Sequence, residues 1–253
     1  MQSDKIIFEM VHLRGVTSFY QPMYGYFNNE SRFTDAGKDL FFEKMKSKSE
    51  AFNKRFELIK NYIPINSNCL EYGCNIGYNT FLASEIEGVS VTGVDKDRRV
   101  IPIAKLLLEY NNLDNIKFIQ AECKKYLESK VDGFYDCIIC LLVGHHILKN
   151  EFTKNLPQSY SELDDVSDKS KKYLKLFLDF IGVLKNKSKR FIVQLRLGVD
   201  GEYFSKEDMD YFSYKDDFFI DYLNDYFSFS NIIRIPATPH SFASPHPIYI
   251  FDS

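Results

Sequence analysis

The most telling absences in this sequence concern membranes, nucleic acids and disulfide bonds. No apolar run approaches the ~20 residues that cross a bilayer, and no apolar stretch typical of a secretory signal follows the polar start of the chain. The 32 Lys and Arg do not exceed the 35 Asp and Glu, so the net charge of -3 does not favour DNA or another nucleic-acid backbone as the main partner. The five cysteines are scattered and odd in number, which is typical of a reducing compartment. We therefore expect a cytoplasmic protein without a membrane span.

The length of 253 residues suits one α/β domain with an N-terminal extension. We divide the chain into a helical and aromatic cap over residues 1–50 and a core over residues 51–253. The cap contains an aromatic stretch at residues 19–27, in which Pro22 and Gly25 argue against one regular element. Two roles stay open for this stretch: a lid over a site, with Tyr20 and Tyr24 as candidate substrate-binding residues, or apolar packing against the core.

The core begins with a helix and continues with strands and helices in alternation. Apolar residues at intervals of three to four over 52–63 predict a helix that ends near Pro64. The alternation that follows predicts a mostly parallel sheet covered on both faces. Lys185 to Arg190 is interpreted as a solvated loop. The expected strands cover residues 69–72, 89–94, 117–120, 135–142, 191–197, 227–235 and 248–251. The expected helices cover 78–86, 171–184 and 216–226, and another runs through residues 103–110 with Pro102 in its first turn.

The segment NCLEYGCNIGYN at residues 68–79 carries the clearest chemical signal. It has the form of a strand that stops at a loop and reopens as a helix, with Glu71 at the strand's carboxyl end. Gly73 allows a sharp turn beside a ligand, and Gly77 allows the helix to start close to the strand. A dinucleotide-binding GxGxxG pattern fails here, because Asn75 and Tyr78 occupy the positions of the second and third glycines.

The same segment resembles motif I of the class I S-adenosylmethionine (SAM) methyltransferases, an acidic residue followed by GxGxG. Glu71, Gly73 and Gly77 match, and Asn75 replaces the middle glycine. The resemblance implies a Rossmann-like fold, with a mostly parallel seven-stranded sheet, helices on both faces and an antiparallel last strand. It also implies SAM as cofactor and S-adenosylhomocysteine as product. In that family the loop passes under the methionyl group, where Asn75 could add an amide hydrogen bond; an ordinary tight turn is the alternative.

Further residues fit the same cofactor. Asp95 ends the second strand about twenty residues past the glycine loop, where a carboxylate can accept both ribose hydroxyls in NAD and SAM proteins alike. Glu122 and Cys123 resemble the family's third motif, in which an acidic side chain binds the adenine amino group and the next amide meets the ring. Lys96, beside Asp95, and Leu141, at the end of the fourth strand, complete this side of the expected cofactor site.

Arg55 resembles a basic residue that some family members use to hold the cofactor carboxylate; a surface arginine is the alternative. No metal is expected. Cys137 and Cys140 form a CxxC pattern, but they lie within a predicted strand, where positions three apart face opposite sides of the sheet.

His145 and His146 follow the fourth strand, where the family places residues that face the transferred methyl group. The Asn/Asp-Pro-Pro-aromatic motif of enzymes that methylate exocyclic base nitrogens is absent, which argues against base methylation. A neutral imidazole can take a proton from an acceptor hydroxyl, although either histidine could instead pack the next helix. Cations that could bind an anionic acceptor are Arg14, Arg32 and Arg196.

The sequence looks similar to methyltransferases of bacterial capsule and other surface-polysaccharide gene clusters. This resemblance implies an O-methyltransferase for a small or saccharide-linked acceptor, either a sugar hydroxyl or the oxygen of a phosphoramidate. Two alternatives stay open: a tRNA-modifying methyltransferase, and a SAM-binding regulator or partner subunit without catalysis. The acceptor, the pathway and the oligomeric state are not predicted.

Overall fold

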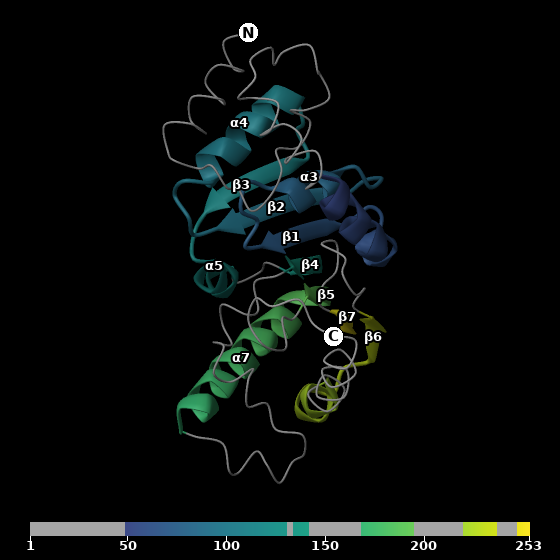
Figure 1. Ribbon diagram of the computed structural model, residues 1–253, viewed down its shortest axis with the longest axis vertical. Helices are drawn as coiled ribbons and strands as arrows, with labels where there is room; N and C mark the ends of the chain where they lie inside the picture. The colour runs from purple at the N-terminus through teal and green to yellow at the C-terminus, as the bar shows by residue number, and fades with distance from the viewer. Residues whose placement is uncertain (1–48, 131–133, 142–167, 195–219, 237–246) are drawn as a thin grey trace. The chain divides into compact units, whose positions relative to one another are not determined.

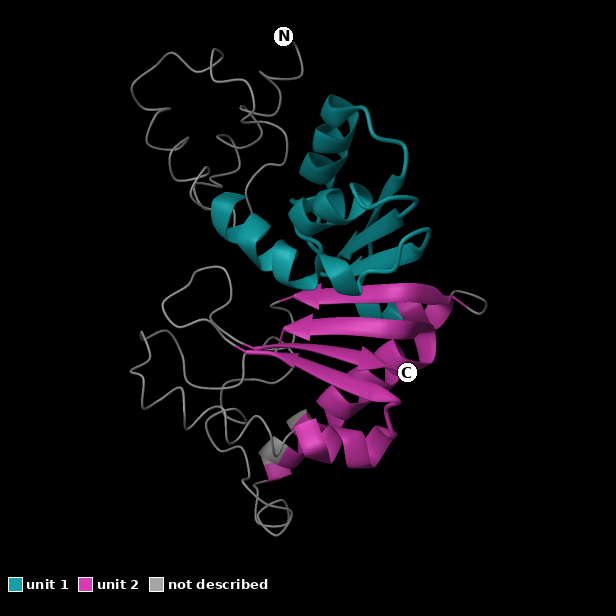
Figure 2. Ribbon diagram, turned by 90° about the vertical axis from the view of Figure 1, so that its right-hand side faces the viewer, with its two compact units in different colours: residues 1–126 teal, residues 127–253 magenta. Residues whose placement is uncertain are grey.

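The computed structural model describes residues 49–130, 134–141, 168–194, 220–236 and 247–253 (Figure 1). The chain divides into two compact units, residues 1–126 and 127–253 (Figure 2). Of the cap expected over residues 1–50, only residues 49 and 50 are described, and both are helical. The cap boundary therefore stays a prediction. Among the described residues, no helix is long and apolar enough to cross a membrane.

Unit 1 is built on three parallel strands in the order β3-β2-β1 (Figure 1). The predicted helix at its start is confirmed over residues 49–59 and continues as a short 3-10 helix, η2, before Pro64. Its expected apolar stripe is buried. The element bounds are β1 Asn68–Tyr72, α3 Tyr78–Ser84, β2 Ser90–Asp95, α4 Ile101–Asn111, β3 Ile116–Gln120, α5 Cys123–Ser129 and η2 Lys60–Tyr62.

Two glycines let α3 pack directly on this sheet. A Cβ atom added to Gly77 would lie 2.3 Å from Cζ of Phe118 on β3, and one added to Gly93 on β2 would lie 2.8 Å from Cδ1 of the same ring. Phe118 is 4% exposed, and its ring centroid lies 5.5 Å from that of Phe81 on α3. The helix that follows the glycine loop therefore starts in close contact with the sheet, as expected for Gly77.

Unit 2 contains four strands in the order β4-β5-β7-β6 (Figure 2, magenta). β4 and β5 are parallel, whereas β7 is antiparallel to both β5 and β6. All seven expected strands are present in the described residues, and the predicted antiparallel last strand is confirmed. The bounds are β4 Tyr135–Leu141, α7 Asp168–Lys187, β5 Ser188–Gln194, β6 Asn231–Ile235 and β7 Ile248–Asp252, with a further helix over residues 220–227.

The loop expected at residues 185–190 is wrong. Helix α7 continues to Lys187, and β5 begins at the next residue. Two contacts explain this direct passage: the Ser188 hydroxyl donates to a carbonyl in the last turn of α7 at 2.8 Å, and Arg190 pairs with Asp252 of β7 at 2.5 Å. Basic side chains in the last helical turn also suit the negative end of the helix dipole.

The expected start of the sixth strand at residue 227 is also wrong. Phe227 ends the preceding helix, and β6 begins at Asn231. Ser228 has φ 52 and its amide donates to the Asn224 carbonyl at 2.7 Å, a left-handed residue that stops the helix. The aromatic residues of this stretch pack partly on the core, since half-buried Phe229 meets the buried rings of Phe191 and Phe251 at 5.6 and 4.8 Å.

Candidate functional site

The glycine loop turns through three residues in the left-handed region. Gly73 has φ 74, Asn75 has φ 52 and Gly77 has φ 87. Asparagine is one of the few residues other than glycine that adopt this conformation readily, which explains how Asn75 replaces the middle glycine. The amides of Gly73 and Cys74 donate to the carbonyl of Val94 at 2.8 and 3.0 Å. These bonds tie the loop to β2, at the carboxyl ends of the strands.

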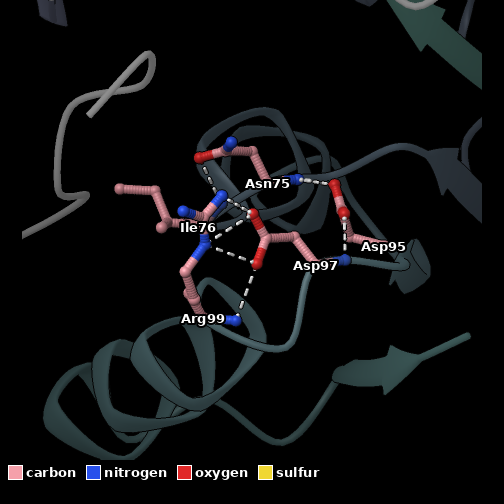
Figure 3. Close-up of polar contacts among 5 residues, drawn as sticks. All are labelled: Asn75, Ile76, Asp95, Asp97 and Arg99. Carbon is pink, nitrogen blue, oxygen red and sulfur yellow. Dashed lines mark hydrogen bonds and ion pairs between the residues drawn. The ribbon is translucent and has the colours of Figure 1, made fainter. Parts of the chain in front are cut away.

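Asn75 uses both its backbone and its side chain within the protein (Figure 3). Its amide donates to Oδ2 of Asp95 at 2.8 Å, and its Oδ1 accepts from the amide of Ile76 at 2.9 Å. The side-chain oxygen thus shapes the loop itself. The expected contact between the Asn75 amide group and the cofactor stays a prediction.

Asp95 is the point where the glycine loop and the loop after β2 meet. Its Oδ2 accepts from Asn75, and its Oδ1 accepts from the amide of Asp97 at 2.8 Å (Figure 3). A carboxylate offers about four lone-pair sites, so these two bonds leave about two for the ribose hydroxyls of the expected cofactor. The remaining acceptor sites of Asp95 therefore fit the hydroxyl groups of a nucleoside. Lys96, the next residue, is exposed.

Glu71 is buried beneath this loop, with 2% of its surface exposed. Its carboxylate accepts from Asn79 Nδ2 at 2.9 Å and from the hydroxyl of Thr80, both in the first turn of α3. Burial raises the pKa of Glu71 to about 7 in spite of these hydrogen bonds, and the charge of Asp95 adds to the rise. Glu71 therefore joins β1 to the start of α3, a role that its place in the motif did not reveal.

Glu122 and Cys123 stand at the start of α5. The Glu122 carboxylate accepts from the amides of Lys124 at 3.2 Å and Lys125 at 2.8 Å, so it caps a helix that the sequence analysis did not predict. The Cys123 thiol is buried and donates to the Val94 carbonyl at 3.2 Å. Burial raises the pKa of this thiol to about 12, which keeps it neutral. The expected adenine contacts of both residues stay predictions.

Arg55 is not the surface arginine of the alternative interpretation. It is 3% exposed, and its guanidinium carbon lies 4.6 Å from the ring centroid of Phe52. The same helix contacts α3 through Tyr78, whose hydroxyl donates to Asn53 at 2.9 Å and whose ring meets Phe52 edge-on. Tyr78 was noticed only as a mismatch to the dinucleotide pattern. Whether Arg55 holds a cofactor carboxylate stays a prediction.

Most residues expected on the acceptor side lie outside the described residues: His145, His146, Arg14, Tyr20, Tyr24, Arg32 and Arg196. Leu141 is described, as the last residue of β4, and is 8% exposed. Cys137 and Cys140 are buried in the same strand. Within the described ranges, no group of three or more His, Cys, Asp or Glu could hold a metal ion. The acceptor site thus stays a prediction from the sequence.

Comparison with known proteins places this geometry in a family context. A family model described as a methyltransferase domain matches residues 65–189, which include the glycine loop, Asp95 and Glu122. The chain is 29% identical over 102 residues to the ribosomal protein L11 methyltransferase of Thermosipho africanus (strain TCF52B). That match covers 40% of this chain and 36% of the relative.

Two crystal structures of WbdD resemble the chain in fold. The bifunctional kinase-methyltransferase WbdD matches with a TM-score of 0.56 and 17% identity, over 97% of this chain and 46% of that chain. A second WbdD structure, at 2.2 Å resolution, matches with a TM-score of 0.54, 18% identity and the same coverage. This chain therefore spans less than half the length of the L11 methyltransferase and of WbdD. The predicted Rossmann-like methyltransferase fold is confirmed, and residues 65–189 match the family model of a methyltransferase domain.

Proposed function

We propose that this protein transfers a methyl group from SAM to an oxygen of a small or saccharide-linked acceptor, in the biosynthesis of capsule or another surface polysaccharide. The observation that carries the proposal is the pair of loops at the carboxyl ends of β1 and β2. Gly73, Asn75 and Gly77 adopt left-handed conformations, and the Asn75 amide donates to Asp95, whose carboxylate keeps lone pairs for a ribose. The methyltransferase-domain match over residues 65–189 supports the same chemistry.

Each cofactor group has a candidate partner in the chain. Asp95 accepts the ribose hydroxyls, Glu122 binds the adenine amino group, and the glycine loop carries the methionyl group. Buried Arg55 is the candidate for the cofactor carboxylate. Bound SAM would supply an electrophilic methyl group: an acceptor oxygen would attack the methyl carbon in line with the C–S bond, and S-adenosylhomocysteine would leave as a neutral thioether. The protein's own work is to align the two reactants and to exclude water.

The acceptor decides which residues do chemical work. A sugar hydroxyl must lose a proton, and His145 is the candidate base, with His146 beside it. In that case, His145→Ala lowers kcat by roughly 10² to 10⁴, and the acid limb of the pH profile follows an imidazole. A phosphoramidate oxygen is already anionic, so neutralising Arg14, Arg32 or Arg196 would instead raise KM. We favour the hydroxyl, because His145 offers a base directly after the fourth strand.

The partial identity with a ribosomal protein L11 methyltransferase gives a second candidate, a protein acceptor. A panel with labelled SAM separates the possibilities. It contains polysaccharide precursors, sugar nucleotides, phosphoramidate-bearing saccharides, ribosomal protein L11 and tRNA, with Asp95→Ala as the control that should lose transfer. Label on a saccharide supports the proposal. Label on L11 or tRNA alone overturns the proposed acceptor, and binding of S-adenosylhomocysteine without transfer favours a regulator or partner subunit. Absence of binding overturns the cofactor assignment.

A further inference from the structure

The polar contacts around Asp95 continue beyond the residues that a ligand would touch. The Asp97 amide donates to Asp95, and the Asp97 carboxylate in turn accepts from Arg99 (Figure 3). Arg99 Nη2 lies 2.6 Å from Oδ2 of Asp97, and Nε lies 3.0 and 3.1 Å from its two oxygens. The Arg99 amide adds a fourth bond at 2.8 Å. A continuous series of contacts therefore runs from the start of α4 to the glycine loop.

This series controls the orientation of Asp95. Each Asp95 oxygen is held by an amide from a different loop, Asn75 on one side and Asp97 on the other. The Asp97 amide points at Asp95 only while the loop after β2 keeps its turn. Arg99 helps to hold that turn, because its guanidinium and amide both bind the Asp97 side chain, and the Val100 amide donates to the Asp97 carbonyl at 3.2 Å. Loss of Arg99 would therefore loosen one of the two bonds that hold Asp95.

We propose that Asp97 and Arg99 are positioning residues for the cofactor, acting through Asp95 on the glycine loop. This inference rests on the proposed function, since it assigns Asp95 to the ribose. Neither Asp97 nor Arg99 is expected to touch the ligand. They fix the β2–α4 loop so that the Asp95 carboxylate and the Asn75 amide stay in register before the cofactor arrives, which lowers the entropic cost of binding.

The electrostatics agree with this geometry. Arg99 lowers the pKa of Asp97, and Asp97 raises the pKa of Arg99. The pair is exposed to solvent, with 69% of the Arg99 side chain and 29% of the Asp97 side chain accessible. Exposed ion pairs are weak and screened by salt, although forked arginine–carboxylate geometry is the strongest kind. The positioning effect should therefore be modest and sensitive to ionic strength.

Calorimetric binding of S-adenosylhomocysteine tests the effect on affinity. Arg99→Ala should raise Kd about two- to fivefold, the range that a favourable exposed pair supplies. Arg98→Ala is the matched control, because Arg98 is an exposed arginine one position away that acts on Asp97 through its charge, and it should change Kd less than Arg99→Ala. Raising the NaCl concentration should raise the Kd of the wild type towards that of Arg99→Ala. The Kd of the variant should depend less on salt. An unchanged Kd for Arg99→Ala, or equal salt responses, would refute the proposal.

Amide hydrogen exchange without any ligand tests the connection to the glycine loop. The Asn75 amide donates to Asp95, so it should exchange faster in Arg99→Ala and in Asp95→Asn than in the wild type. The double variant should exchange no faster than Asp95→Asn alone, since both changes act on one bond. If the effects of the two substitutions on the exchange rate add, or if the exchange rate of the Asn75 amide does not change in Arg99→Ala, the series of contacts does not position the glycine loop. This readout stays decisive even if S-adenosylhomocysteine does not bind, an outcome that would overturn only the proposed function.

Discussion

Different interactions stabilise the loops of unit 1 and the sheet of unit 2. At the carboxyl ends of β1 and β2, short polar contacts dominate: Asp95 accepts two amides, and buried Glu71 accepts two side chains. In unit 2, β7 is packed by aromatic rings, with Phe251 at 4.8 Å from both Phe191 and Phe229. Polar contacts can fix the positions of groups that bind a ligand. Ring packing stabilises the fold but does not position such groups.

The largest expected effect comes from the aromatic side of this comparison. Phe251 is fully buried and stacks on Phe191 with an interplanar angle of 16°. Phe251→Ala should lower the free energy of unfolding by about 3–5 kcal/mol, since it removes a large buried side chain and leaves a cavity. Denaturant unfolding measures the loss. The affinity of the folded fraction for S-adenosylhomocysteine should stay unchanged. A parallel loss of affinity would contradict the view that the aromatic packing of unit 2 supplies stability and the polar loops of unit 1 bind the ligand.

A single added methyl group makes the next test. Gly77→Ala places Cβ 2.3 Å from the buried Phe118 ring and forces alanine to φ 87. Overpacking and the left-handed backbone together should cost about 2–5 kcal/mol of unfolding free energy.

The matched control is Gly182→Ala in α7 of unit 2, where the new Cβ lies 3.5 Å from Phe227, an ordinary contact distance. This helical position should gain up to about 1 kcal/mol. Chemical denaturation of both variants gives the two values. If Gly77→Ala is as stable as the wild type, the close packing of α3 on Phe118 is wrong.

The third test follows the titration of Glu71, a buried carboxyl group of unit 1. Its folded-state pKa of about 7 lies above the ordinary value of 4.5 for a glutamate, so the folded protein binds the proton more tightly than the unfolded chain. Stability from this group is therefore full below about pH 4.5 and declines up to about pH 7, by about 3 kcal/mol in total.

Glu71→Gln has nearly the same size and no charge, so it isolates this effect. Its unfolding free energy relative to the wild type should rise between pH 4.5 and 7 and then level off. Denaturant unfolding over pH 5 to 8 measures the difference. A constant difference across that range would show that the carboxyl group titrates normally.

The same comparison explains what could be predicted from the sequence. The strands follow from apolar runs bounded by turn residues, and the glycine loop follows from Gly73 and Gly77, whose left-handed angles need glycine. The errors at Lys187 and Phe227 arose because a basic run and an aromatic run were assigned by composition, while contacts with other elements decided their conformation.

The inner contacts of the site were less accessible to sequence reasoning. Asp97 and Arg99 form a local turn that belongs to no motif, and Glu71 was identified by its motif rather than by its buried partners. The Glu122 cap was harder to find, because glutamate is not among the preferred N-cap residues, although its negative charge suits the N-terminus of a helix. The candidate acceptor residues, from Arg14 to Arg196, lie outside the described residues, so their roles stay predictions from the sequence.

The smallest expected effect concerns Asn75, where conformation and hydrogen bonding oppose each other. Asn75→Gly relieves a residue at φ 52 but loses the bond from the Ile76 amide to Oδ1, so the net change in stability should be below about 1 kcal/mol. Asn75→Ala loses the same bond and keeps the left-handed strain, so it should cost about 1–2 kcal/mol more than the glycine variant. Both variants keep the amide that donates to Asp95. Affinity for S-adenosylhomocysteine should therefore follow the backbone, nearly normal for Asn75→Gly and weaker for Asn75→Ala. If the glycine variant binds tenfold more weakly than the wild type, the Asn75 side chain contacts the cofactor directly, and the loop-shaping role alone is insufficient.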